Sequence, residues 1–94
     1  MKEVLIEIIG KMLRELDSEE YTITELFTFT GYSSAHPDML YAVSCAIRLC
    51  FLKRYTGTGY RLTDVGIEAR DMLIEDKYED FVTLLNQQSN ARRL

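Results

Sequence analysis

The sequence has little of the residues that interrupt helices or cross-link small domains. Its 94 residues include one proline, five glycines, one histidine, two cysteines and no tryptophan. So little proline, together with 47% hydrophobic residues, is typical of a globular chain and excludes a disordered one. No apolar run approaches the ~20 residues that cross a bilayer, and the N-terminus lacks the pattern of a signal peptide. We therefore expect one domain without a membrane segment, located in the cytoplasm.

The two cysteines, Cys45 and Cys50, lie five residues apart in one expected helix. They point in different directions at this spacing, so a disulfide between them would break the helix. We interpret both as reduced thiols, with Cys50 in the core and Cys45 on the exposed side. With His36 as the single histidine, the spacing does not fit a zinc site, so we expect no metal and no other cofactor. His36 itself is expected to be solvated.

Four segments have the apolar periodicity of helices. They are residues 2–16, a short segment between Thr22 and Gly31, residues 37–51 and residues 64–88. The last pattern allows either one long helix or a break near residues 76–77. Residues 1–88 are expected to form the single domain, and residues 89–94 a flexible tail.

Helix-end signals support these boundaries. Thr22 followed by Glu25 fits a capping box, and Gly31 suits a left-handed C-cap. Pro37 suits the first turn of the third helix, and Thr63 is a suitable N-cap for the last one. The sequence thus fixes where most helices should begin or end.

Residues 52–56 and 59–62 are rich in β-forming residues and are separated by Gly57 and Thr58. Glycine at the first of two turn positions favours a tight two-residue hairpin. Because a lone hairpin is unstable in water, we expect it to pack against the helices.

The third helix has two distinct faces in this interpretation. One is an apolar stripe, expected to be buried, of Leu40, Val43, Ile47, Cys50 and Phe51. The other is an exposed face of Asp38, Tyr41, Cys45, Arg48 and Leu49. Of the tyrosines nearby, Tyr32 and Tyr55 are expected to pack at the edge of the core.

The last helix carries more apolar surface than a small domain can bury. A second apolar stripe on this helix therefore suggests a dimer interface with another copy of the chain. The residues expected in the interface are Ile74, Tyr78, Phe81, Val82 and Leu85. The alternative is that this segment folds back on the first helix. Its acidic residues are expected to form a solvated face.

Charge is unevenly distributed along the chain. The formal net charge is −4, yet residues 33–61 contain four basic side chains and one acidic side chain. An acidic protein is not suited to coating nucleic acid nonspecifically. A local basic surface on an acidic body would restrict such contacts to one side.

The order of these elements resembles the winged-helix (winged helix-turn-helix) domain of small bacterial and archaeal transcription regulators. TITELFTFTG at 22–31 is similar to the capped second helix, and MLYAVSCAIRLCFLKR at 39–54 to the recognition helix and first wing strand. YRLTDVG at 60–66 is similar to the second wing strand and the start of the next helix. The resemblance implies a mainly α fold with a small β-hairpin, in the order α-α-α-β-β-α, with an extended C-terminal helix used for dimerisation.

The resemblance also implies a function: sequence-specific binding of double-stranded DNA by a homodimeric transcription regulator. The third helix would enter the major groove, where Arg48 can pair with guanine. The implied DNA contacts are Ser33, Ser34, Tyr41, Ser44, Cys45, Arg48, Lys53, Arg54, Thr58 and Arg61. Arg48 could equally form a surface ion pair, and Ser33 and Ser34 could be ordinary turn residues.

The alternative function is a winged-helix module that binds a protein partner in a larger complex without contacting DNA. The acidic body, the single arginine on the recognition face and an exposed Leu49 favour it. No phosphate-binding loop, catalytic serine motif or paired carboxylates are recognisable, so we do not expect an enzyme.

Overall fold

The computed structural model describes residues 1–31 and 36–92 and is mainly helical, with a small antiparallel sheet. Its helices are α1 (Glu3–Arg14), α2 (Ile23–Thr30), α3 (Pro37–Arg48), α4 (Asp64–Ile74) and α5 (Tyr78–Arg92). Its strands are β1 (Tyr21–Thr22), β2 (Leu52–Arg54) and β3 (Gly59–Leu62). The α+β class expected from the sequence is therefore confirmed.

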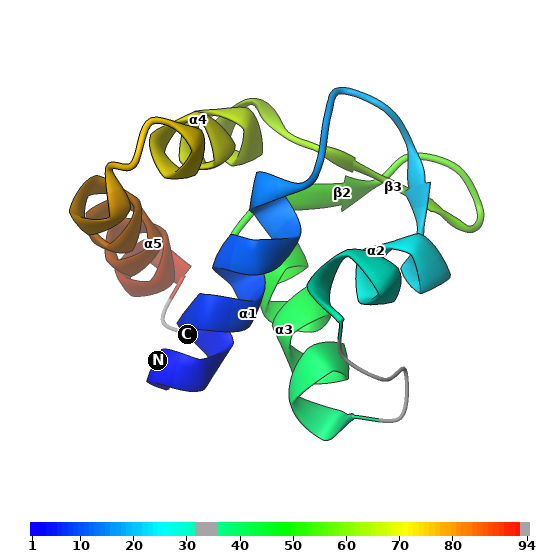
Figure 1. Ribbon diagram of the computed structural model, residues 1–94, viewed down its shortest axis with the longest axis horizontal. Helices are drawn as coiled ribbons and strands as arrows, with labels where there is room; N and C mark the ends of the chain where they lie inside the picture. Colours follow the sequence, from blue (N-terminus) through cyan, green and yellow to red (C-terminus); the bar gives the residue numbers. More distant parts are fainter. Residues whose placement is uncertain (32–35, 93–94) are drawn as a thin grey trace.

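Helix α1 lies at the centre of the molecule, with α2, α3 and α4 packed around it (Figure 1). Its apolar residues are buried on more than one side of the helix, which explains why they are so numerous. They are Leu5, Ile6, Ile8, Ile9, Met12 and Leu13. The charged residues between them, such as Glu7 and Lys11, remain exposed. The amphipathic pattern thus identified the helix that anchors the core.

The sheet has three strands in the order β1-β3-β2, all antiparallel. Tyr21 pairs with Tyr60, and Lys53 pairs with Arg61. Strand β1 was not predicted, because two residues are too few to show the alternation that marks a strand. It adds a third strand to the expected hairpin and connects the hairpin to the start of α2.

The β2–β3 hairpin is wider at its tip than the sequence predicted. The Tyr55 amide donates a hydrogen bond of 2.8 Å to the Gly59 carbonyl, and residues 55–58 form the connection. Gly57 does not adopt the positive φ that a two-residue turn beginning with glycine requires. The tight two-residue turn was therefore wrong, although the antiparallel hairpin itself is confirmed. The first strand ends at Arg54 instead of Thr56, and Arg54 pairs with Tyr60, one position away from the pairing that a two-residue turn at 57–58 would give.

Most predicted helix ends are confirmed by the local hydrogen bonds. Thr22 and Glu25 form a reciprocal capping box, and Gly31 ends α2 with φ 75°. Pro37 occupies the first turn of α3, and the Thr63 hydroxyl accepts from the Gly66 amide at the start of α4. These ends are set by chemistry within a few residues, which is why the sequence revealed them.

Helix α3 ends in a turn with an unusual residue. The Cys50 amide donates to the Ile47 carbonyl and the Phe51 amide to the Ala46 carbonyl, the paired bonds of a Schellman motif. Cys50 occupies the left-handed position, with φ 63°, where glycine is usually found. Cys50 and Phe51 therefore leave the helix instead of extending its apolar stripe.

The C-terminal region breaks into two helices, as one of the two sequence interpretations allowed. The Lys77 amide donates to the Met72 carbonyl at 2.8 Å, and Asp76 takes the left-handed position with φ 62°. Helix α5 then folds back beside α1 (Figure 1). The Phe81 ring on α5 lies against Gly10 of α1. One continuous helix over residues 64–88 is thus wrong. Residues 89–92, expected in the tail, continue α5, and Ser89 is buried.

The faces of α3 are rotated from those expected. Leu40 and Ile47, predicted to be buried, are exposed, whereas Cys45 and Leu49, predicted to be exposed, are buried. The residues that the rest of the fold covers are Met39, Ala42, Val43, Cys45, Ala46 and Leu49. The small side chains of Ala42 and Ala46 allow α3 to pack closely against its neighbours. Because alanine is only weakly hydrophobic, the sequence pattern did not indicate these two positions as core.

A compact contact joins the turn after α3 to the start of α4. The Phe51 carbonyl accepts a 3.0 Å hydrogen bond from the Thr63 amide, and the Thr63 hydroxyl donates to the Cys50 carbonyl. Gly66 lies directly on this turn, because a Cβ atom there would be 2.0 Å from the Phe51 carbonyl oxygen. Gly66 is therefore required for close approach of two backbones.

We predict that Gly66→Ala destabilises the protein by about 3 kcal/mol, because the added methyl group meets backbone that cannot rotate away. Gly57→Ala is the matched control, since a Cβ atom there meets nothing within 4 Å. Urea unfolding of both variants measures the difference. Equal stabilities for the two variants would contradict the contact described here.

Candidate functional site

The outward face of α3 combines apolar and polar side chains. Leu40 and Tyr41 are 52% and 53% exposed, and Ser44, Ile47 and Arg48 are also exposed. Their spacing places them on one side of the helix. This surface has one cation but also three large apolar groups, a composition that suits either a nucleic-acid base edge or a protein partner.

Three of the DNA contacts expected on the third helix, Tyr41, Ser44 and Arg48, lie on this face. Cys45 does not, because it is only 3% exposed. Its thiol has the Tyr41 side chain as a hydrogen-bond partner, and burial raises the pKa of Cys45 above its ordinary value. Cys45 therefore lies on the buried side of α3, where it packs in the core. Ser33 and Ser34, together with Tyr32, lie outside the described residues.

The β2–β3 hairpin presents cations on both of its faces. Lys53 and Arg61 are directly opposite each other in the pairing, as are Arg54 and Tyr60. Side chains alternate along a strand, so Lys53 and Arg61 share one face and Arg54 lies on the other. Lys53, Arg54 and Thr58 are exposed, while Arg61 is half-buried.

Tyrosines hold two of these arginines in place. The Arg54 guanidinium donates to the Tyr60 hydroxyl at 3.2 Å and lies 5.6 Å from the centre of that ring. Arg61 lies 4.6 Å from the centre of the Tyr55 ring and donates to the Ser18 carbonyl at 2.7 Å. Tyr55 is exposed, so its expected place at the core edge was wrong. The hydrogen bond to Ser18 and the partial burial of Arg61 limit its contact with a ligand. Lys53 and Arg54 are the more accessible cations of the hairpin.

His36 has a structural role that the sequence did not indicate. Its Nδ1 accepts a 3.2 Å hydrogen bond from the Asp38 amide, so His36 is the N-cap of α3. The side chain is half-buried and not simply solvated. Histidine is uncommon at this position, where Ser, Thr, Asp and Asn are preferred, and composition therefore did not reveal the cap.

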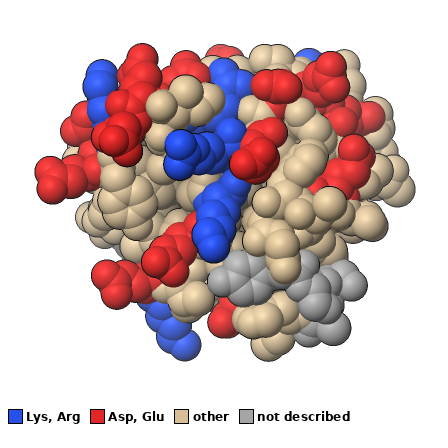
Figure 2. All heavy atoms as spheres, in the orientation of Figure 1, with Lys and Arg blue, Asp and Glu red and all other residues tan. Residues whose placement is uncertain are grey.

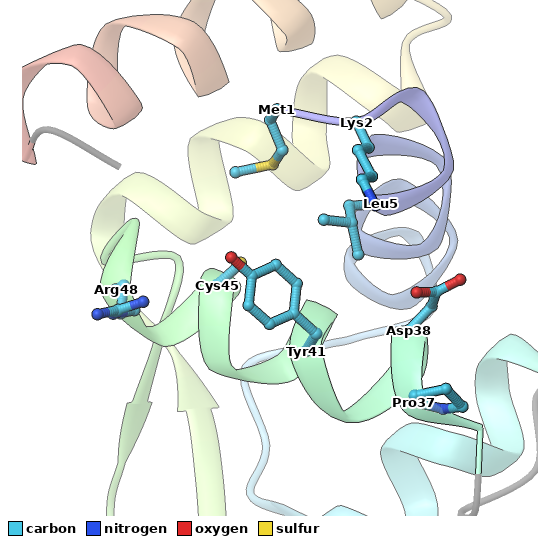
Figure 3. Close-up of a pocket in the computed structure, with 8 residues that line it drawn as sticks. All are labelled: Met1, Lys2, Leu5, Pro37, Asp38, Tyr41, Cys45 and Arg48. Atoms are coloured by element: carbon cyan, nitrogen blue, oxygen red, sulfur yellow. The ribbon is translucent and has the colours of Figure 1, made fainter.

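A groove of about 700 Å³ lies between the N-terminal end of α1 and α3 (Figure 3). Its lining comprises Met1, Lys2, Leu5, Pro37, Asp38, Tyr41, Cys45 and Arg48. Sequence reasoning missed this groove, because it joins residues some 40 positions apart in the chain. Tyr41 and Arg48 therefore belong both to the groove and to the outward face of α3.

Acidic groups dominate the opposite end of the fold. The carboxylates of α4 and early α5 are exposed, as predicted, and comprise Glu68, Asp71, Glu75, Asp76, Glu79 and Asp80. Two are paired with cations, in the pairs Arg70–Asp71 at 3.0 Å and Lys77–Glu75 at 3.3 Å. Figure 2 shows one face of the molecule, where a short central band of Lys and Arg is surrounded by Asp and Glu.

The expected dimer surface is only partly available. Phe81 and Leu85 are completely buried within the chain, where the Phe81 ring lies 6.3 Å from that of Phe51. Ile74 and Tyr78 are 56% and 47% exposed, and Val82 is half-buried. The alternative interpretation, in which this segment folds back on the first helix, accounts for Phe81 and Leu85.

Within residues 1–31 and 36–92, no three His, Cys, Asp or Glu side chains are grouped to hold a metal ion. No helix in the described part of the chain is long and apolar enough to cross a membrane. Comparisons with protein-family models, curated proteins and solved structures find no match for this chain.

We predict that iodoacetamide modifies Cys50 before Cys45 at mildly alkaline pH. Cys45 is buried and its pKa is raised, so less of it is thiolate at any given pH, whereas Cys50 is half-buried. Mass spectrometry of peptides after timed labelling measures the order. Unfolding in urea should make the two rates similar, and faster labelling of Cys45 in the folded protein would contradict the prediction.

Proposed function

We propose that the protein is a winged-helix domain that binds double-stranded DNA in a sequence-specific manner and regulates transcription. The observation that carries this proposal is the position of exposed polar groups on α3 and on the hairpin that follows it. Tyr41, Ser44 and Arg48 face outward from α3, and Lys53 and Arg54 are exposed on β2. The hairpin would be the wing, and α3 the recognition helix.

The order of elements supports this proposal. A short strand between the first and second helices pairs with the second hairpin strand, which gives the order β1-β3-β2. A helix followed by a turn and a second, outward-facing helix is the arrangement that DNA-binding helix-turn-helix units use. The support is topological and does not by itself identify a ligand.

In this mechanism α3 enters the major groove, which is wide enough for a helix. The Arg48 guanidinium can donate two hydrogen bonds to the O6 and N7 atoms of guanine, and Ser44 can contact a neighbouring base. Arg54 would bind a phosphate, with the Tyr60 hydroxyl orienting its guanidinium. Lys53 extends from the opposite face of the hairpin and would contact a phosphate on the other side of the wing. Phosphate contacts position the protein, and the α3 side chains provide base specificity.

A homodimer would place two such units on a palindromic site. The exposed Ile74 and Tyr78, at the junction of α4 and α5, are the apolar groups available for this contact, with Val82 at their edge. Phe81 and Leu85 are excluded from the surface by their burial. Sizing of the free protein at increasing concentration tests this part of the proposal.

We predict that Arg48→Ala weakens binding to a selected DNA site by about 1–3 kcal/mol and relaxes base preference at one position. Arg54→Ala should weaken binding to all sequences and reduce the slope of log affinity against log salt by about 1. Arg92→Ala removes the same charge from the end of α5 and is the control. Fluorescence anisotropy after selection from random duplexes provides the measurement, and equal effects of all three substitutions would refute the proposal.

A second candidate function is docking of a protein partner on the same face of α3. The exposure of Leu40 and Ile47 favours it, because large apolar groups on a surface often mark a protein contact. With Arg48, Lys53 and Arg54 nearby, a complementary partner would be an acidic segment with an apolar face.

The two functions predict different sensitive residues. For DNA binding, Leu40→Ser should have little effect while Arg48→Ala is costly. For protein docking, Leu40→Ser and Ile47→Ser should each abolish capture of the partner, and no duplex should bind at moderate salt. Affinity capture run beside the anisotropy measurement separates the two, and a partner still captured by both serine variants would exclude docking on this face.

A further inference from the structure

We propose that the groove between the N-terminal end of α1 and α3 binds a small amphipathic organic anion, with an aromatic or aliphatic body and one carboxylate or sulfonate. The groove is separate from the hairpin and from the acidic surface of α4 and α5. Binding of the anion does not depend on the proposed DNA function. The effect of the bound anion on DNA binding does rest on the proposed function.

The size and lining of the groove suit such a ligand. Its volume of about 700 Å³ lies within the usual range for small-molecule sites, ~300–1,000 Å³. Met1, Leu5, Pro37 and the ring of Tyr41 provide an apolar lining. Leu5 comes from α1, Met1 precedes that helix, and Pro37 and Tyr41 come from α3, which packs against α1. Figure 3 shows Leu5 and Tyr41 facing across the groove. An apolar body of about two fused rings would replace water along this surface.

The inner wall is uncharged and rigidly placed. Cys45 is buried beneath Tyr41, and its raised pKa keeps the thiol protonated at neutral pH. Leu5 is buried as well, at the packed interface of α1 and α3. A neutral wall formed by core residues favours an apolar ligand body and needs little rearrangement on binding.

The charged groups of the lining favour an anion over a cation. The charged side chains of the lining comprise two cations, Lys2 and Arg48, and one carboxylate, Asp38. Figure 3 shows Arg48 at one end of the α3 segment and Asp38 near the other, with the Tyr41 hydroxyl turned toward Cys45. An anionic head at the Arg48 end would accept hydrogen bonds from its guanidinium, far from the Asp38 carboxylate. Arg48 thus fixes the orientation of the ligand as well as its charge.

Occupation of the groove would oppose DNA binding, if the proposed function is correct. Arg48 and Tyr41 lie on the outward face of α3 and also line the groove. A guanidinium paired with a bound carboxylate or sulfonate is not free to pair with guanine, so the two ligands compete by mass action. The anion would therefore act as an inducer that releases DNA.

The test uses two fluorescent probes with the same ring system, anionic anilinonaphthalene sulfonate and uncharged N-phenylnaphthylamine. We expect the sulfonate to bind the folded protein with a stoichiometry of one and to bind more tightly than the neutral probe. Arg48→Gln should weaken sulfonate binding about tenfold and leave the neutral probe unchanged. Arg14→Gln, at the far end of α1, removes the same charge and should change neither affinity.

Nuclear magnetic resonance locates the bound probe. Chemical-shift changes are expected at the Leu5 methyl groups and the Tyr41 ring, and not at Ile67 or Met72 on α4. The inference is overturned if the sulfonate does not bind, if Arg48→Gln and Arg14→Gln have the same effect, or if the shifts map elsewhere.

A second measurement separates this inference from the DNA proposal. If the sulfonate binds and Arg48→Gln weakens that binding, but the protein binds no DNA duplex, the groove is a ligand site and the DNA function is refuted. In a protein that does bind DNA, added sulfonate should weaken DNA binding in proportion to its occupancy of the groove. DNA affinity that is independent of saturating probe would refute the competition.

Discussion

The contact between the turn after α3 and the first turn of α4 is the constraint on which the rest of the structure depends. The Phe51 side chain is fully buried and lies beside Phe81, while its carbonyl binds Thr63 and its backbone touches Gly66. One residue thus connects the end of α3, the start of α4 and the inner side of α5. Because two backbones meet there, the contact tolerates no added side-chain atom.

This contact also positions the candidate site. The turn at Cys50 and Phe51 ends α3 and leads directly into β2, so the direction of the hairpin relative to α3 is set there. Packing of Ala42 and Ala46 in the core sets the rotation of α3 about its axis. Together they determine that Tyr41 and Arg48 face outward and that Lys53 and Arg54 follow on the hairpin.

The same rotation of α3 explains why its surface is chemically mixed. With Cys45 and Leu49 turned inward, Leu40 and Ile47 become exposed beside Ser44 and Arg48. The groove shared with α1 then borders the outward surface, and Arg48 belongs to both. Tyr41 and Arg48 are thus part of both surfaces, so a substitution at either residue changes the groove and the outward face together.

The sequence alone determined the features that depend on neighbouring residues. The capping box at Thr22, the left-handed Gly31, the Pro37 start of α3 and the Thr63 cap each rest on hydrogen bonds or dihedral preferences within a few positions. Tertiary structure decided the rest, namely which face of α3 is buried, that Phe81 and Leu85 enter the core, and that a two-residue strand joins the hairpin. These outcomes depend on how segments far apart in the chain pack and pair with each other. Because such contacts are not repeated along one segment, they produce no periodic pattern in the sequence.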